Sequence, residues 1–257
     1  MNDNKKELVI GRQPVLETLK QGHPIRILLA SGHQRGAIID SILDLAGSKQ
    51  IPVEQLSKPL FEKTIGFLPG HQGVAALVKP FSYLSLEELL TGISPSQSPP
   101  LLLLLDHLQD PQNLGAIIRT AHFAGVEAVI IPKHRSAQVT PAVRKAAAGA
   151  AEILPLVQVT NLIQTVQYLK QAGFWIYGAE TDGDIPYYQA DYRVPLVLVM
   201  GSEGRGLTPL VRRHCDQILY IPMSGSGGSL NVSVAAAIII FAAVGRRQGW
   251  ARSKVEE

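Results

Sequence analysis

The stretch LLLLLDHLQDPQNLGAIIRTAHFAG, residues 101–125, predicts one strand followed by one helix. Its first part, Leu101–Leu105, is apolar on both faces and too short for a helix, which is typical of a central strand in a parallel sheet. Asp110 and Pro111 then form a polar cap with proline at the first helical position, and Gly125 is placed to end the helix. A strand, a loop and a helix in this order form the basic unit of an α/β fold.

The sequence beyond residue 125 repeats this alternation of strands and helices. Thr140-Pro141 and Thr208-Pro209 are two further helix starts with the same cap and proline. The strand-like runs are VEAVII from Val126, EILPLV from Glu152, FWIYGA from Phe174, LVLVM from Leu196 and QILYIPM from Gln217. This pattern predicts a parallel, Rossmann-like sheet in a domain of residues 100–257. The last segment, 230–249, is apolar around most of its first four turns, so we expect a second surface to cover it.

The first part of the chain predicts a separate small domain. In residues 1–79, short apolar runs alternate with helical patterns, in the order LVI, PVLETLK, IRILLA, IIDSILDLAG and GVAALV, which is typical of an α/β domain. Residues 80–99 are predicted to link the two domains. Ser85 and Glu88 form a capping-box pattern that begins one short helix, and the following TGISPSQSPP is too rich in Ser, Pro and Gly to pack a core.

Composition limits the class of protein. A chain of 257 residues with 46% hydrophobic content can fold two domains, and a net charge of +3 with a pI near 9.0 is compatible with a polyanionic partner. The single cysteine, Cys215, forms neither an internal disulfide nor a cysteine-based zinc site, so we expect a reducing compartment and no bound metal. The longest apolar stretch, 232–244, is shorter than the roughly 20 residues that span a bilayer. We therefore expect a cytoplasmic protein without a membrane segment.

Three loops contain residues suited to chemistry, and the first follows the strand at 101–105. It places Asn113 in the first turn of a helix and Arg119 nearly two turns further on. Arg119 lies beside an apolar stripe made of Leu114, Ile117, Ile118 and Ala121. Two interpretations stay open for this side chain: it points into a cleft at the strand ends, or it is an ordinary solvated arginine.

The second loop is Gly201-Ser-Glu203-Gly-Arg-Gly206, directly after the strand LVLVM. Its glycines allow positive φ angles and a close approach of a ligand to the backbone, and Glu203 is a candidate polar contact. This spacing is neither the G-x-G-x-x-G dinucleotide fingerprint nor a P-loop. The third loop includes Ser229 and Asn231, either of which is suited to cap the last helix. Taken singly, each loop is also compatible with a simple cap, turn or linker.

Together, DPxNxGxxxR from Asp110, GSEGxGL from Gly201 and SLNVS from Ser229 resemble the three motifs of the SPOUT superfamily of knotted methyltransferases, in its TrmH branch of RNA ribose 2′-O-methyltransferases. They occur in the family's order over roughly residues 100 to 250. The first domain resembles the substrate-binding domain of these enzymes, which is similar in fold to the ribosomal L30e and L7Ae proteins, through 10–12 and 71–74. This pairing of domains most closely resembles bacterial 23S rRNA guanosine 2′-O-methyltransferases that act near the peptidyl-transferase centre.

The resemblance implies a trefoil knot, a homodimer with its sites beside the interface, and S-adenosylmethionine held in the knot around Gly201, Ile221 and Leu230. By position it associates Arg119 with activation of the ribose hydroxyl. The other residues that it places in the polar site are Asn113, Glu203, Ser229 and Asn231. Since a guanidinium stays protonated far above neutral pH, we expect Arg119 to hold the adjacent phosphate and stabilise the alkoxide, and the proton acceptor stays open.

An RNA partner requires basic residues outside the motifs. The predicted RNA-binding residues are Arg12, His71, Arg144 and Lys145. Other basic residues placed to hold the RNA backbone, in a salt-dependent manner, are Lys133, Arg135, Arg205, Arg212 and Arg213. We interpret the tempting acid-base candidates His107, His122 and His134 as local hydrogen-bonding groups.

Three alternatives stay open at this point. They are a tRNA ribose 2′-O-methyltransferase, a non-catalytic RNA-binding protein of the same fold, and a nicotinamide-dependent oxidoreductase. Intact motif residues argue against the second alternative. The third is disfavoured because the glycine loops follow late strands, whereas the dinucleotide motif ends the first strand of its unit.

Overall fold

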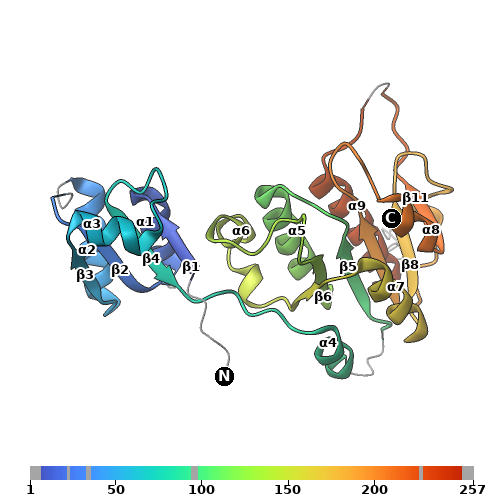
Figure 1. Ribbon diagram of the computed structural model, residues 1–257. Coiled ribbons are helices and arrows are strands. Elements are labelled where there is room, and N and C mark those ends of the chain that lie inside the picture. The colour runs from blue at the N-terminus through green and yellow to red at the C-terminus, as the bar shows by residue number, and fades with distance from the viewer. Residues whose placement is uncertain (1–6, 22–23, 33–35, 94–97, 226–227, 251–257) are drawn as a thin grey trace, which may run out of the picture. The chain divides into compact units, whose positions relative to one another are not determined.

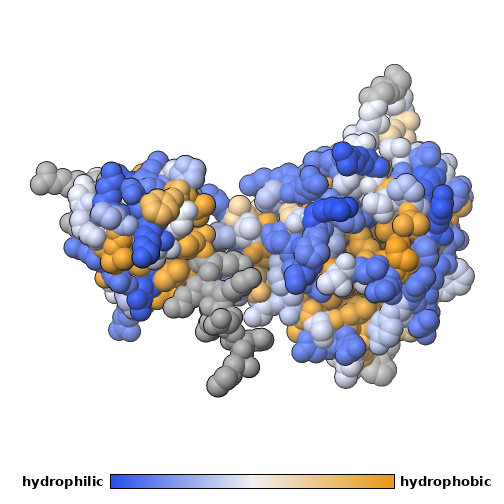
Figure 2. All heavy atoms as spheres, viewed as in Figure 1, coloured by the Kyte–Doolittle hydropathy of each residue, from blue (hydrophilic) through white to orange (hydrophobic). Residues whose placement is uncertain are grey.

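The computed structural model describes residues 7–21, 24–32, 36–93, 98–225 and 228–250. The chain divides into two compact units between Ser82 and Tyr83 (Figure 1). Within the described ranges, no helix combines the length and apolar character needed to cross a membrane. Each unit shows mostly hydrophilic residues interrupted by hydrophobic patches in the space-filling view (Figure 2).

The N-terminal unit is a four-stranded sheet covered by helices on both faces. Its strands lie in the order β1 (Glu7–Ile10), β4 (Val74–Val78), β2 (Pro24–Ala30) and β3 (Val53–Leu56). Only β2 and β3 pair in parallel, and β4 is antiparallel to both of its neighbours. The helices are α1 (Arg12–Gln21), α2 (Ala37–Ser48) and α3 (Lys58–Ile65). One core cluster contains α1 and α2 residues and the other contains α3 residues, so the helices take opposite faces. The predicted α/β class of this domain is confirmed.

The C-terminal unit is built on a seven-stranded sheet in the order β7-β6-β5-β10-β8-β11-β9, and all of its neighbouring strands are parallel. In chain order the strands are β5 (Leu101–Leu105), β6 (Ala128–Pro132), β7 (Leu156–Val159), β8 (Trp175–Ala179), β9 (Ile185–Pro186), β10 (Leu196–Met200) and β11 (Gln217–Tyr220). Every residue of β5, β6 and β10 is buried. This confirms the Rossmann-like parallel sheet that the apolar runs predicted.

Helices cover both faces of this sheet. α5 (Pro111–Ala124) and α9 (Val232–Gln248) pack against each other on one face, with α6 (Pro141–Ala147) beside α5 (Figure 1). α4 (Leu86–Gly92), α7 (Leu162–Gln171) and α8 (Pro209–His214) contribute to the core on the other face. The predicted helix starts at 111, 141 and 209 are confirmed, as is the glycine that ends α5, Gly125 with φ +77°.

Two predicted boundaries differ from the structure. The strand expected from Glu152 begins only at Leu156, because 150–152 form a 3₁₀ turn ahead of Pro155. The linker was expected over 80–99, but the chain divides between Ser82 and Tyr83, and α4 belongs to the C-terminal unit.

Several contacts join residues 83–89 of the predicted linker to the C-terminal unit. The Leu84 N–H donates to the Leu156 carbonyl at 2.9 Å, and the Val139 N–H donates to the Tyr83 hydroxyl at 2.8 Å. The Ser85 capping box begins α4 as predicted, and Leu89, only 5% exposed, enters the core of the C-terminal unit. The segment is therefore part of the folded unit, because the apolar face of this short helix packs into the core although the residues around it are polar.

Candidate active site

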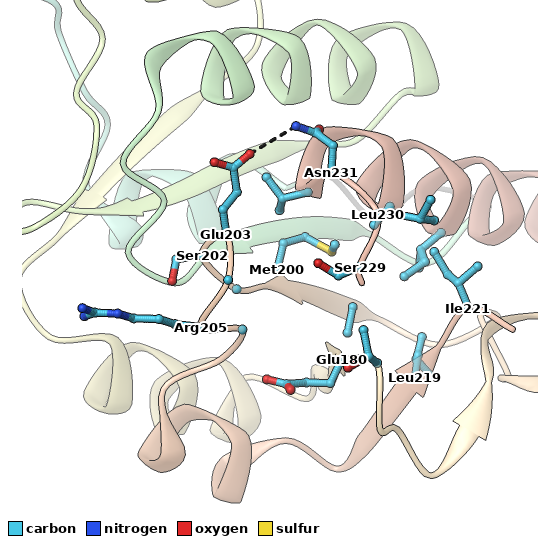
Figure 3. Close-up of a pocket in the computed structure, with 18 of the residues that line it drawn as sticks. Glu180, Met200, Ser202, Glu203, Arg205, Leu219, Ile221, Ser229, Leu230 and Asn231 are labelled. Atoms are coloured by element: carbon cyan, nitrogen blue, oxygen red, sulfur yellow. Dashed lines mark hydrogen bonds between the residues drawn. The ribbon is translucent and has the colours of Figure 1, made fainter. Parts of the chain in front are cut away.

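The three motif loops meet at the carboxyl edge of the large sheet. The Asn231 Nδ2 donates to Asn113 Oδ1 at 3.0 Å and to Glu203 Oε1 at 3.1 Å, and the Asn113 amide also donates to Glu203 Oε1. Glu203 and Asn231 therefore point toward one another across the site (Figure 3). Asn113 is only 6% exposed, so its amide depends on these partners. One residue from each motif joins this network, which we call the motif triangle: Asn113, Glu203 and Asn231.

Helix caps position two members of the motif triangle. The Asp110 side chain accepts from the backbone N–H groups of Gln112 and Asn113, which fixes Asn113 in the first turn of α5. Asn231 caps α9, since its Oδ1 accepts from Ser233 N at 2.8 Å and from Val234 N at 3.4 Å. Of the two predicted capping candidates, the structure therefore selects Asn231. Its oxygen holds the helix while its amide nitrogen joins the site.

The glycines of the second motif close a tight loop. Ser202 and Gly206 exchange two backbone hydrogen bonds of 3.0 and 2.9 Å. A Cβ atom on Gly201 would lie 2.1 Å from the Gly206 carbonyl carbon, and Gly206 has φ +65°. Only glycine fits at position 201, and this closed loop exposes its backbone to the adjacent cavity.

Two carboxylates that the sequence analysis did not single out hold this loop. Asp106, fully buried after β5, accepts from Thr208 N at 2.6 Å and contacts His107 Nδ1 at 2.5 Å. Glu180, directly after β8, accepts from Leu207 N at 2.5 Å. An acidic residue immediately after a buried strand was the available signal in both cases. His107 takes the local hydrogen-bonding role that we predicted for it.

A cavity of about 570 Å³ opens beside the motif triangle, in the size range of small-molecule sites. It is lined by all three residues predicted to hold the cofactor, Gly201, Ile221 and Leu230, and by three of the predicted polar residues, Glu203, Ser229 and Asn231. Lining residues that the sequence analysis missed include Glu180, Met200, Leu219, Met223 and Ile239. The cavity thus has a mixed lining of apolar side chains and polar groups, with Glu180 and Glu203 on two sides (Figure 3).

Arg119 does not line this cavity. It is exposed on α5 and makes no ion pair within the described part of the chain. The apolar stripe of the helix packs inward, as its buried residues show, and turns Arg119 toward the surface. In a single copy of the chain, the structure therefore separates Arg119 from the cavity that Glu203, Ser229 and Asn231 line.

The predicted RNA-binding residues have different surroundings. The backbone N–H of Arg12 donates to Gln72 Oε1 at 3.2 Å, and His71 Nδ1 accepts from Gly73 N at 3.0 Å. Residues 10–12 and 71–74, which carry the resemblance to a substrate-binding domain, therefore contact each other. Arg144 is 10% exposed and pairs with Glu152 at 3.5 Å, whereas Lys145 is exposed.

Arg212 and Cys215 lie in surroundings that explain them without a role in the site. Arg212 donates to Asp182 at 2.7 Å, and this hydrogen bond lowers the pKa of that carboxyl. Burial raises the pKa of the Cys215 thiol to about 12, which suits a structural cysteine. No group of three or more potential metal-ligating side chains occurs among the residues whose positions are described.

The family model described as SpoU rRNA Methylase matches residues 100–241, which contain all three loops. The chain belongs to the SpoU rRNA methylase family. A second model, RNA 2′-O ribose methyltransferase substrate binding, matches residues 8–84 of this SpoU family member.

Relatives and solved structures agree with this family. Proteins of Pseudomonas putida and Pseudomonas aeruginosa, both named 23S rRNA (guanosine-2′-O-)-methyltransferase RlmB, are 44% identical over 91% of this chain and 94% of their own length. The SpoU methyltransferase AviRb from Streptomyces viridochromogenes, solved with the cofactor AdoMet, gives a TM-score of 0.64 at 25% identity, covering 95% of this chain and 91% of its own. An AdoMet-bound rRNA methyltransferase from Sinorhizobium meliloti gives 0.61 at 25% identity, covering 93% and 87%. The trefoil knot and the L30e likeness stay predictions.

Proposed function

We propose that this protein transfers a methyl group from S-adenosylmethionine to the 2′-hydroxyl of a guanosine in 23S rRNA, near the peptidyl-transferase centre, in the cytoplasm. The motif triangle at the edge of the cavity is the observation that carries the proposal, because it joins three stretches of sequence into one polar site. The 44% identity to proteins named for this activity supports the choice of 23S rRNA over tRNA.

The cavity suits an adenosyl cofactor. Its apolar lining, including Met200, Leu219 and Ile221, is appropriate for a base and a hydrocarbon chain, and the closed glycine loop offers backbone groups for hydrogen bonds. Glu180 and Glu203 add carboxylate acceptors to the walls, and Arg205 adds a guanidinium donor, so polar groups of both kinds surround the apolar part. The cofactor supplies an electrophilic methyl group on a sulfonium, so no further activation of the donor is required.

The chain's own residues must align the ribose hydroxyl and lower the cost of removing its proton. The motif triangle holds the Glu203 carboxylate with two amide donors, which fixes it at the mouth of the cavity. Ser229 adds a hydroxyl to the same lining. We assign these groups to binding and orienting the ribose. We assign Arg119 to the adjacent phosphate and to stabilising negative charge on the oxygen.

We infer that the protein acts as a homodimer formed through α5 and α9. These two helices pack side by side and expose large apolar residues, including Phe123 at 71% and Phe241 at 41%. Phe123 lies one helical turn beyond Arg119 on the same face of α5, since residues four apart adjoin on a helix. A second copy that covers Phe123 would therefore surround Arg119 and supply the site that a single copy leaves incomplete.

A methyl-transfer assay tests the proposal. The protein is incubated with labelled S-adenosylmethionine and, separately, with unmodified 23S rRNA and unmodified tRNA, and the labelled nucleotide is identified by nuclease digestion and mass spectrometry. The expected product is 2′-O-methylguanosine in 23S rRNA only, and Asn113→Ala should abolish it. Label in tRNA alone would favour the tRNA alternative. Binding of both RNAs without transfer would favour the non-catalytic one.

Calorimetry with both candidate cofactors tests the remaining alternative. S-adenosylmethionine should bind and NADH should not. Binding of NADH alone would show that the cavity serves an oxidoreductase and that the methyl-transfer proposal is wrong.

A further inference from the structure

The loop of residues 133–140 joins β6 to α6 at the carboxyl edge of the large sheet. β6 pairs with β5, whose end leads into the first motif, so this loop and the first motif loop are neighbours. The loop begins with three consecutive exposed residues that are basic or can become so: Lys133, His134 and Arg135. We call this loop the basic loop.

Hydrogen bonds hold the basic loop in one conformation against the first motif. Ala137 N and Ser136 Oγ both donate to the Leu108 carbonyl, at 2.7 and 3.0 Å. Inside the loop, Gln138 Nε2 donates to the Pro132 and Ser136 carbonyls at 3.0 and 3.1 Å. Leu108 lies two residues before the cap of α5, so the basic loop is tied to the segment that positions Asn113.

Arg135 has φ +55°. Residues other than glycine rarely adopt this left-handed backbone conformation, and glycine occupies it without strain. Backbone strain of this kind persists where the surroundings enforce it, and it concentrates at functional sites. Arg135 therefore carries a long cationic side chain at a position better suited to glycine, and this side chain is exposed.

No described residue balances the positive charge of the basic loop by an ion pair. Arg144 pairs with Glu152, and Arg212 pairs with Asp182, so these basic residues are partly neutralised. Lys133 and Arg135 have no ion-pair partner in the ranges of the chain that the structure covers. Two uncompensated cations on a fixed loop form a site for an anion.

We infer that Arg135, assisted by Lys133, binds a backbone phosphate of the RNA strand whose ribose enters the active site. Between β6 and the Gly201–Gly206 loop after β10 lies only β5, so two strand spacings, about 10 Å, separate the two loops at the sheet edge. A guanidinium binds phosphate through two parallel hydrogen bonds, which fixes orientation as well as charge. The inference rests on the proposed function in one respect, that the anion is RNA.

Arg135→Gly is the decisive variant, because glycine accepts the positive φ and removes the guanidinium without disturbing the loop. The matched control is Arg193→Ala, which removes an exposed arginine near the start of β10, at the opposite edge of the sheet. Affinity for a 23S rRNA fragment is measured at several KCl concentrations. S-adenosylmethionine affinity and the thermal midpoint are measured in parallel.

Arg135→Gly should weaken RNA binding about tenfold and reduce the slope of log affinity against log salt by about one. Lys133→Ala combined with Arg135→Gly should reduce that slope by about two. Cofactor affinity and the thermal midpoint should not fall, and Arg193→Ala should resemble the wild type in every measurement.

Unchanged RNA affinity and salt slope in Arg135→Gly would overturn the inference, as would equal effects in Arg193→Ala. A fall in cofactor affinity or thermal midpoint would assign Arg135 a structural role instead. The measurement needs binding and no turnover, so it separates the two proposals. If the wild type methylates tRNA and not rRNA, the choice of rRNA fails, and the same titration on tRNA still decides the role of Arg135.

Discussion

The Asn231 side-chain amide donates to Asn113 Oδ1 at 3.0 Å and so joins residues 118 positions apart in sequence. Each of these asparagines lies at the N-terminal end of a helix, α9 and α5 respectively. Their contact aligns the starts of the two helices, and the Glu203 carboxylate completes the arrangement from a third loop. Substitutions at Asn231 therefore separate the stability of a helix from the integrity of the site.

Asn231→Ala removes both the cap of α9 and the motif triangle, whereas Asn231→Ser keeps a cap that is too short to reach Asn113. We expect both variants to lose at least 100-fold in turnover, because both lose the amide donors. Only the alanine variant should also lose about 1 kcal/mol in the free energy of unfolding, measured in urea. Near-wild-type turnover in the serine variant would show that Asn231 is only a cap.

Gly201→Ala places a methyl group where the Gly206 carbonyl carbon would lie 2.1 Å away, so the loop must open. We expect at least a tenfold loss of S-adenosylmethionine affinity by calorimetry. The matched control is Gly225→Ala in the third loop, where a Cβ meets nothing within 4 Å, and it should bind normally. Equal affinities in the two variants would contradict a role for the closed loop in cofactor binding.

Arg119→Ala should lower kcat by at least 100-fold and change cofactor affinity less than twofold, because the exposed side chain acts on the RNA. Arg119→Lys keeps the charge and loses the two-pronged geometry, so an intermediate rate is expected. Single-turnover kinetics with saturating RNA measure the effect. A near-normal rate in the alanine variant would remove Arg119 from the reaction.

Phe123→Glu places a charge on the apolar surface of α5 that we assign to the dimer. Sedimentation velocity should show a dimer for the wild type and a monomer for this variant, with lost activity but a retained fold by circular dichroism. Tyr168→Glu, an exposed aromatic on α7 at 45%, is the control and should stay dimeric. A monomeric and active wild type would show that the interface is not needed.

Truncation tests the position of the domain boundary. A fragment of residues 83–257 keeps Tyr83, Leu84 and α4, and we expect it to fold and bind S-adenosylmethionine while losing selectivity for rRNA. A fragment of residues 100–257 removes Leu89 from the core and should have a thermal midpoint several degrees lower, since burying a leucine contributes about 2 kcal/mol. Equal midpoints would support a linker over the whole of 80–99.

Local patterns predicted the parts of the structure that local physics determines. The apolar runs gave β5 and β10, the cap-and-proline pairs gave the starts of α5 and α6, and the family motifs indicated Asn113, Glu203 and Asn231 as one site. β3 and α3 were not predicted, because β3 is a short, half-exposed strand and α3 is only eight residues long.

Features that depend on tertiary contacts could not be predicted in full from apolar runs, helix caps and motifs. Asp106 and Glu180 can be located from the sequence by their positions after buried strands, but their partners, Thr208 and Leu207, are defined only by the fold. The surface position of Arg119 follows from packing on the opposite face of its helix. Its proposed relation to a second copy of the chain is likewise outside what a single-chain pattern can predict.

The double use of Asn231 has a consequence for how an active molecule arises during protein synthesis. Its oxygen begins α9 and its nitrogen completes the site, so neither is in place until the final helix has left the ribosome and docked. A chain that ends before Asn231 therefore lacks both the cap of α9 and the motif triangle. Under the proposed function, the residue that begins α9 also finishes the site, so a nascent copy that has not reached this residue stays inert toward the rRNA around it.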